Sequence, residues 1–107
     1  MKTIKEIYRI GHGPSSSHTM APRFASEQFL KRHPEAVRFE VTLYGSLAAT
    51  GKGHLTDVAI LEVLEQNAPV TINWQPDVFL PYHPNGMTFK SYDADGVLTE
   101  EWTVYSV

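Results

Sequence analysis

The C-terminal part of the chain constrains the fold most, because it contains two strand patterns separated by a tight turn. Residues 87–93, MTFKSYD, and residues 97–107, VLTEEWTVYSV, are rich in β-branched and aromatic side chains, which favour strands. The Asp-Ala-Asp-Gly sequence between them is typical of a β-hairpin connection. Strands joined in this way pair antiparallel, so the sequence predicts at least one antiparallel pair in a sheet.

Two further segments are predicted to be strands. In residues 37–45, VRFEVTLYG, apolar and polar side chains alternate, as they do in a strand with one buried face. The apolar side chains expected on the buried face are Val37, Phe39, Val41 and Leu43. Residues 70–74, VTINW, form a second strand pattern.

Three segments show helical spacing of apolar residues. The first is residues 3–9 and the third is residues 56–66. The second begins at about Thr19, has Pro22 in its first turn and is ended by Pro34. The expected apolar face of the first segment is Ile4, Ile7 and Tyr8, and that of the second is Ala21, Phe24, Ala25 and Phe29. The expected apolar face of the third is Val58, Leu61 and Leu64. Helices combined with a hairpin predict an α+β fold in which helices pack on a mainly antiparallel sheet.

Composition excludes several classes of function. A chain of 107 residues, 42% hydrophobic and 20% charged, is the size of one globular domain. Its net charge of −3 and lack of a basic cluster argue against nucleic acid, and no apolar run approaches the ~20 residues of a membrane span. There is no cysteine, so this chain offers no thiolate ligand or nucleophile. The expected compartment is the cytoplasm.

The serine run in residues 11–22, GHGPSSSHTMAP, is the first candidate site. Serines just before a helix present hydroxyls beside unpaired backbone N–H groups, and the helix dipole adds partial positive charge. Such a place suits a carboxylate or a phosphate. The alternative is that one serine caps the helix while the others are solvated.

The second candidate site is the loop at residues 44–54, YGSLAATGKGH. Its glycines allow the backbone to approach a ligand closely. Lys52 supplies a cation and His54 a group that titrates near neutral pH. It is not a nucleotide-binding P-loop, because Gly53 stands where that motif needs Ser or Thr. The alternative is a strand-to-helix turn with incidental polar residues.

Other polar residues are expected to be structural. His33, next to the proline that ends the second helix, is expected to be a solvated C-terminal cap. The spacing of His12 and His18 matches no metal motif. Glu100 and Glu101 are expected to be solvated positions of the hairpin.

Taken together, the loops resemble a known family. Residues 13–22, GPSSSHTMAP, residues 43–54, LYGSLAATGKGH, with Thr-Asp at 56–57, and residues 83–87, HPNGM, occur in this order. They are similar to motifs of the iron–sulfur-dependent bacterial L-serine dehydratases (L-serine ammonia-lyases), and they span nearly the whole chain. The chain departs from the family pattern at His12, at Ala21 and at Leu55, the last two standing where glycine is common.

The resemblance implies a domain organisation and a set of partners. In this family a β domain, or a separate β chain, precedes an α domain whose cysteines bind a [4Fe–4S] cluster. We therefore expect residues 1–107 to be a single β domain, cut before the α domain and binding no cofactor itself. Its fold would resemble the allosteric substrate-binding domain of D-3-phosphoglycerate dehydrogenase. The expected partners are L-serine, the α domain or α chain, and further copies of the chain in a homo-oligomer.

The resemblance also implies residue roles. The family reaction removes water and then ammonia from L-serine to give pyruvate, a step of amino-acid catabolism that supplies gluconeogenesis. A cluster iron would bind the leaving hydroxyl as a Lewis acid, and a histidine suits the proton transfer. The catalytic residues would be His54 and His18. The substrate-binding residues would be Ser15, Ser16, Ser17, Thr19, Lys52, Thr56 and Asp57.

A second class of function stays open at this point. The same fold in phosphoglycerate dehydrogenase serves regulation and assembly. On that reading the chain is a regulatory module that binds a small anion or an amino acid and dimerises, without a direct catalytic role.

Overall fold

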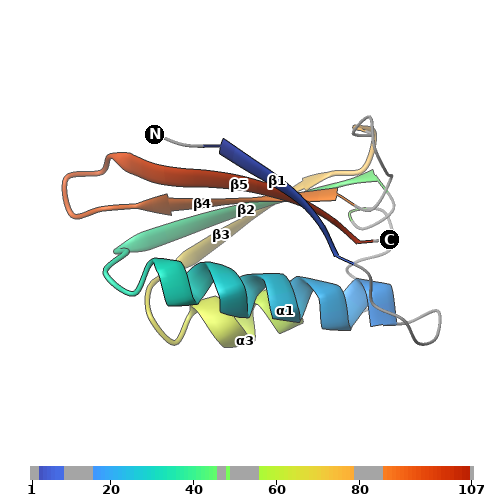
Figure 1. The fold of residues 1–107 in the computed structure, drawn as a ribbon, viewed down its shortest axis with the longest axis horizontal. Coiled ribbons are helices and arrows are strands. Elements are labelled where there is room, and N and C mark those ends of the chain that lie inside the picture. The colour runs from blue at the N-terminus through green and yellow to red at the C-terminus, as the bar shows by residue number, and fades with distance from the viewer. Residues whose placement is uncertain (1–2, 9–15, 46–47, 49–55, 79–85, 107) are drawn as a thin grey trace.

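Within the described residues, helices α1 (Ser16–Arg32) and α3 (Thr56–Leu64) pack on one face of a five-stranded sheet (Figure 1). A computed structural model describes residues 3–8, 16–45, 48, 56–78 and 86–106. The elements are β1 (Thr3–Tyr8), α1 (Ser16–Arg32), β2 (Arg38–Tyr44), α3 (Thr56–Leu64), β3 (Val70–Gln75), β4 (Gly86–Tyr92) and β5 (Leu98–Ser106). Figure 1 shows α1 and α3 lying side by side beneath one face of the sheet. This arrangement confirms the predicted α+β class.

The sheet is mixed, with the strand order β1-β5-β4-β2-β3. The antiparallel pairing is centred on β4, which pairs in this sense with both β2 and β5. The two outer pairs, β1 with β5 and β2 with β3, are parallel. In the described sheet, β1, β2, β3 and β5 therefore run in one direction and β4 runs in the other.

The hairpin prediction is confirmed. The N–H of Gly96 donates to the carbonyl of Asp93 over 2.9 Å, and the N–H of Asp93 donates to the carbonyl of Val97 over 3.0 Å. Gly96 has a φ of 77°, a left-handed conformation that only glycine adopts at little cost. The strands predicted at 37–45 and 70–74 are also confirmed, as β2 and β3.

The helix predicted for residues 3–9 is wrong, because this segment is strand β1. It pairs in parallel with β5, from Thr3 opposite Glu101 to Tyr8 opposite Ser106. An isolated helix of so few residues is marginal in water, whereas β5 offers a complete row of backbone hydrogen-bond partners. Helical spacing of two isoleucines and a tyrosine could not reveal a partner strand so far along the chain.

Helix α1 ends as predicted but begins three residues earlier than expected. It starts at Ser16 rather than Thr19, so Pro22 is the seventh residue of the helix and lies outside its first turn. On its apolar face Ala21, Ala25 and Phe29 are fully buried. The prediction for Phe24 is wrong, because this residue is 41% exposed.

The buried face of α3 is also rotated relative to the prediction. Leu64 is buried as expected, but Val58 is 41% exposed and Leu61 is half-exposed. The residues that are buried are Thr56, Ala59, Ile60, Val63 and Leu64. Both sets have helical spacing, and packing against α1 and the sheet selects between them. In β2 the alternation is confirmed for Phe39, Val41 and Leu43, whereas Val37 precedes the strand and is 46% exposed.

Four fully buried aromatic rings form the centre of the core. Phe29 of α1 stacks on Trp102 of β5, with ring centroids 5.9 Å apart and an interplanar angle of 3°. It also lies 5.4 Å from the ring of Phe89 on β4 and 6.0 Å from that of Phe39 on β2. One side chain of α1 therefore contacts all three central strands.

We expect Phe29→Ala to lower the free energy of unfolding by about 3–5 kcal/mol, because it leaves a cavity among three aromatic rings. The matched control is Phe24→Ala on the exposed side of the same helix, for which we expect a loss of about 1 kcal/mol or less. Urea titration of both variants measures the difference. Equal losses would contradict the central role of Phe29.

Candidate functional site

The topology brings three connections of the chain to one end of the sheet. The connections from β1 to α1, from β2 to α3 and from β3 to β4 all leave the carboxyl ends of strands that run in the same direction. Figure 1 shows the described ends that flank these connections at the same end of the molecule as the end of β5. Ligands of α/β sheets commonly bind at the carboxyl ends of strands, so this end is the candidate site.

Both helices begin at the candidate site. Each helix follows the carboxyl end of one strand and precedes the amino end of another, so α1 and α3 run parallel to each other and opposite to those strands. Two sets of backbone N–H groups without intrahelical acceptors therefore face the same end of the molecule. Their dipoles add partial positive charge there, which Asp57 in the first turn of α3 offsets, so the start of α1 is the one that favours an anionic ligand.

The charges along α1 agree with that polarity. No acidic residue lies in its first turn, whereas Lys31 and Arg32 lie in its last turn. The two cations offset the negative end of the helix dipole, and the positive end has no carboxylate of its own in that turn. No acidic side chain of the first turn therefore competes with an external anion for the positive end of the dipole.

Part of the predicted site falls within the described residues. Ser16, Ser17, His18 and Thr19 form the first turn of α1. Thr56 and Asp57 open α3, where Thr56 is fully buried and Asp57 is half-buried. The structure thus brings the serine run and the Thr-Asp pair, some forty residues apart in sequence, to the starts of two adjacent parallel helices.

Other predicted positions lie outside the described residues. These are Ser15, Lys52 and His54. Their roles stay predictions, and so does the choice between an anion site and simple capping for the serine run. Because α1 begins at Ser16, Ser15 is the residue that immediately precedes it, the position at which a capping serine is expected.

A cluster of charged side chains that the sequence analysis missed lies where α1 ends. Glu100 of β5, only 6% exposed, accepts hydrogen bonds from Nε and Nη2 of Arg32, each 3.3 Å long. Its other partner is Nε2 of His33. The guanidinium of Arg32 also lies 4.3 Å from the ring centroid of Trp102. The expectations of a solvated His33 cap and a solvated Glu100 are therefore wrong.

Burial and pairing act in opposite directions on Glu100. Burial raises the pKa of its carboxyl, but hydrogen bonds from His33 and Arg32 and their positive charge lower the pKa, and the net result lies below the ordinary value. The sequence held a signal for this residue, since Glu100 shares the strand face of the core residues Trp102 and Val104 at period two. Because it lies at the opposite end of α1 from the candidate site, we assign the cluster a structural role.

A second polar network lies on the sheet face that the helices leave uncovered. Glu40 accepts a hydrogen bond of 2.6 Å from Nδ2 of Asn73 and one of 3.0 Å from the hydroxyl of Tyr92. Burial raises the pKa of Glu40, and these bonds together with the charges of Lys90 and Arg38 outweigh it, so its pKa is lowered. The network links the three adjacent strands β4, β2 and β3 through their side chains.

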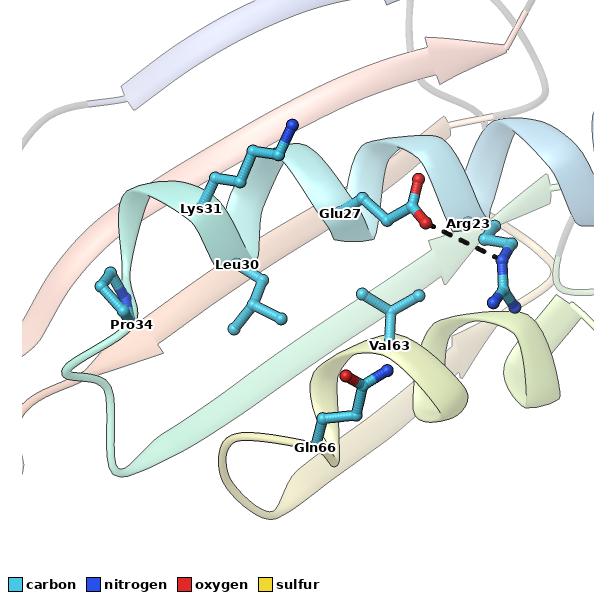
Figure 2. A pocket seen from close by; sticks show the side chains of 7 residues that line it. All are labelled: Arg23, Glu27, Leu30, Lys31, Pro34, Val63 and Gln66. Atoms are coloured by element: carbon cyan, nitrogen blue, oxygen red, sulfur yellow. Dashed lines mark ion pairs between the residues drawn. The ribbon is translucent and has the colours of Figure 1, made fainter.

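One groove is visible on the outer side of the helix layer. Figure 2 shows it between α1 and α3, with Leu30 and Val63 facing each other across its floor and the Arg23–Glu27 ion pair on its rim. Its volume is about 540 Å³, and Arg23 also bridges it to Glu62 of α3 over 3.2 Å. The lining combines the buried Val63 and the partly buried Leu30 with exposed polar side chains, and it lies away from the first turns of α1 and α3.

Two kinds of feature are absent from the residues that the structure describes. Among residues 3–8, 16–45, 48, 56–78 and 86–106, no group of three or more His, Cys, Asp or Glu residues is arranged to hold a metal ion. In the same part of the chain, no helix combines the length and the apolar character that crossing a membrane requires.

Comparison with known proteins gives consistent matches. A family model described as "Serine dehydratase beta chain" matches residues 3–77. The chain is 54% identical to an L-serine dehydratase of Helicobacter pylori (strain J99), over 98% of this chain and 31% of that protein. It is 36% identical to an L-serine dehydratase of Mycobacterium tuberculosis, over 98% of this chain and 31% of that protein. It is 32% identical to L-serine dehydratase 1 of Escherichia coli K12, over 100% of this chain and 32% of that protein.

Two facts about these relatives matter for the site. The chain spans about a third of the length of each of them. The alignments are also longer than the chain itself, so the relatives carry additional residues within the matched region.

The charge cluster generates a prediction about stability in acid. We expect Glu100→Gln to lower the free energy of unfolding near neutral pH by about 1–3 kcal/mol, because Arg32 and His33 lose a charged hydrogen-bond partner. Since the pKa of Glu100 is lowered by folding, its contribution is present above the ordinary carboxyl pKa and is lost as the pH falls through the lowered value. The difference between the variant and the wild type should therefore shrink in acid.

Urea titrations at a series of pH values measure this difference. The matched control is Glu101→Gln, which changes the next residue on the opposite face of β5 and should leave the wild-type pH dependence in place. A gap between Glu100→Gln and the wild type that stays constant down to strongly acidic pH would contradict the assignment.

Proposed function

Because the chain belongs to the serine dehydratase beta chain family, we propose that it is the β-domain part of an enzyme that converts L-serine to pyruvate and ammonia. The observation that carries the proposal is topological. The described parts of the family motifs, the first turn of α1 and the start of α3, lie at one end of the sheet. In this proposal the chain supplies one wall of an active site, and the α part of the enzyme supplies the rest.

The first turn of α1 would bind the substrate carboxylate. Its backbone N–H groups have no intrahelical acceptors, and no acidic side chain lies in that turn. Ser15, Ser16, Ser17 and Thr19 would add hydroxyl donors beside them. A carboxylate is the one group of L-serine with a full negative charge, so this end of the helix discriminates in favour of it over the ammonium group.

Proton transfer is assigned to the histidines. His54 would exchange the proton at Cα of the substrate, since imidazole is the side chain whose ordinary pKa suits a base near neutral pH. His18, in the first turn of α1, would assist at the carboxylate end of the substrate. Lys52 would contribute positive charge. The buried Thr56, with Asp57, would fix the end of the loop that carries His54.

The residues of this chain do not fit an iron–sulfur cluster. The chain has no cysteine, and the part that the structure describes holds no cluster of other metal-binding side chains. We therefore assign the [4Fe–4S] group to the α part and give this chain only substrate binding and proton transfer. An α domain or α chain and L-serine are the partners that the proposal requires.

The direct test is anaerobic pyruvate formation from L-serine. The chain is assayed alone, and then mixed or fused with its cysteine-bearing α part after reconstitution with iron and sulfide. We expect activity in the joined sample only. A joined sample that contains the cluster and remains inactive would overturn the proposal and would favour a regulatory module, which titration with L-serine and simple anions would then examine.

The role of His54 gives a second test. In the complete enzyme we expect His54→Ala to lower kcat by a factor of about 100 or more, as for a positioned acid or base. The control is His33→Gln, which should lower the melting temperature by breaking the contact with Glu100 while kcat stays near the wild-type value at a temperature where the variant is folded. Near-normal turnover of His54→Ala would reject its assigned role.

A further inference from the structure

Helix α1 contains a residue that does not suit its position. Pro22 is the seventh residue of the helix, and a proline there has no N–H to donate to the carbonyl of His18, four residues earlier. Its ring also crowds that carbonyl, so interior prolines bend or break helices. The hydrogen-bond ladder of α1 is therefore interrupted between the first turn and the rest of the helix.

A second helix-bending feature follows one turn later. The hydroxyl of Ser26, which is fully buried, donates to the carbonyl of Pro22 over 2.7 Å. A serine hydroxyl bonded to the carbonyl four residues earlier competes with the backbone and often bends a helix. Pro22 is itself buried. The two features act one turn apart, at the carbonyls of His18 and Pro22, and the residues that cause them, Pro22 and Ser26, both lie on the packed side of α1.

The part of α1 beyond these residues is held firmly. Ala25 and Phe29 are fully buried in the core, and Phe29 stacks on Trp102. Arg32 and the adjacent His33 are bonded to Glu100 of β5. If the first turn and the body of the helix differ in direction, the first turn is therefore the part that is displaced.

We propose that Pro22 and Ser26 are positioning residues that set the direction of the first turn of α1 independently of the helix body. Resting on the proposed function, this inference assigns the pair a task in substrate binding. The pair aims the N–H groups of residues 16–19 at the carboxylate of an amino acid and lets that turn tighten when the substrate binds. An uninterrupted helix would lock the first turn to the direction that core packing gives to Phe29.

The test is Pro22→Ala in the complete enzyme. Restoring the missing N–H should raise the melting temperature, since alanine favours the helix over proline. It should also raise KM for L-serine about tenfold, with a smaller change in kcat, because a misplaced carboxylate site weakens substrate binding. Hydrogen exchange of residues 16–19 should slow when L-serine binds to the wild type, because the substrate then accepts from N–H groups that have no intrahelical acceptor, and it should slow less in the variant.

Two further variants separate positioning from a merely structural role. Pro34→Ala, beyond the end of α1, is the matched proline control and should leave KM unchanged. Ser26→Ala should raise KM in the same direction by a smaller factor. A Pro22→Ala enzyme that is more stable but keeps the wild-type KM and the wild-type exchange response would overturn the inference.

This failure is distinguishable from failure of the proposed function. If the wild-type complete enzyme forms no pyruvate, the proposed function is wrong and the variants are not informative about KM. If the wild type is active while Pro22→Ala behaves like Pro34→Ala, only the inference about α1 is wrong.

Discussion

The stacking of Phe29 on Trp102 is the contact on which the rest of the arrangement depends. It attaches α1 to β5 at the centre of the sheet, and the neighbouring rings of Phe39 and Phe89 extend the attachment to β2 and β4. The ion pair between Arg32 and the buried Glu100 fixes the same helix one turn further on. With its body held in this way, α1 can present its first turn to the end of the sheet where the candidate site lies.

Local patterns predicted the parts of the fold that depend on nearby residues. The Asp-Ala-Asp-Gly turn, the alternation in β2 and the termination of α1 before Pro34 follow from short-range chemistry, and the structure confirms them. Local patterns gave the wrong structure where a partner far away in the sequence determines it. Residues 3–8 become a strand only because β5 provides an edge for them, and the buried face of α3 is chosen by packing between two sets of apolar residues with similar spacing.

The candidate site shows the same division. The serine run and the Thr-Asp pair were found from motif resemblance, and the topology brings both to one end of the sheet. His33 was missed because a polar residue at a helix end resembles a solvated one until its partner is known, whereas the spacing of Glu100 with Trp102 and Val104 was a signal of burial that the charge of Glu100 obscured. Their pairing joins α1 to β5 across most of the chain, which no local pattern can indicate. Buried charges are tolerated when they are paired and hydrogen-bonded, as these are.

The parallel pairing of β1 with β5 joins the first strand of the chain to the last one. During synthesis β1 leaves the ribosome before the other strands of this sheet, and its partner β5 is made only after them. Contacts between segments so far apart in sequence form slowly. Until β5 has been made, β1 is an unpaired strand that can pair wrongly with other chains. The sequence of β1 contains Lys5 and Glu6. Charged residues in an unpaired strand disfavour wrong edge-to-edge pairing before β5 is made. The pairing of β1 can therefore be completed only after β5, the second strand of the hairpin, has been made.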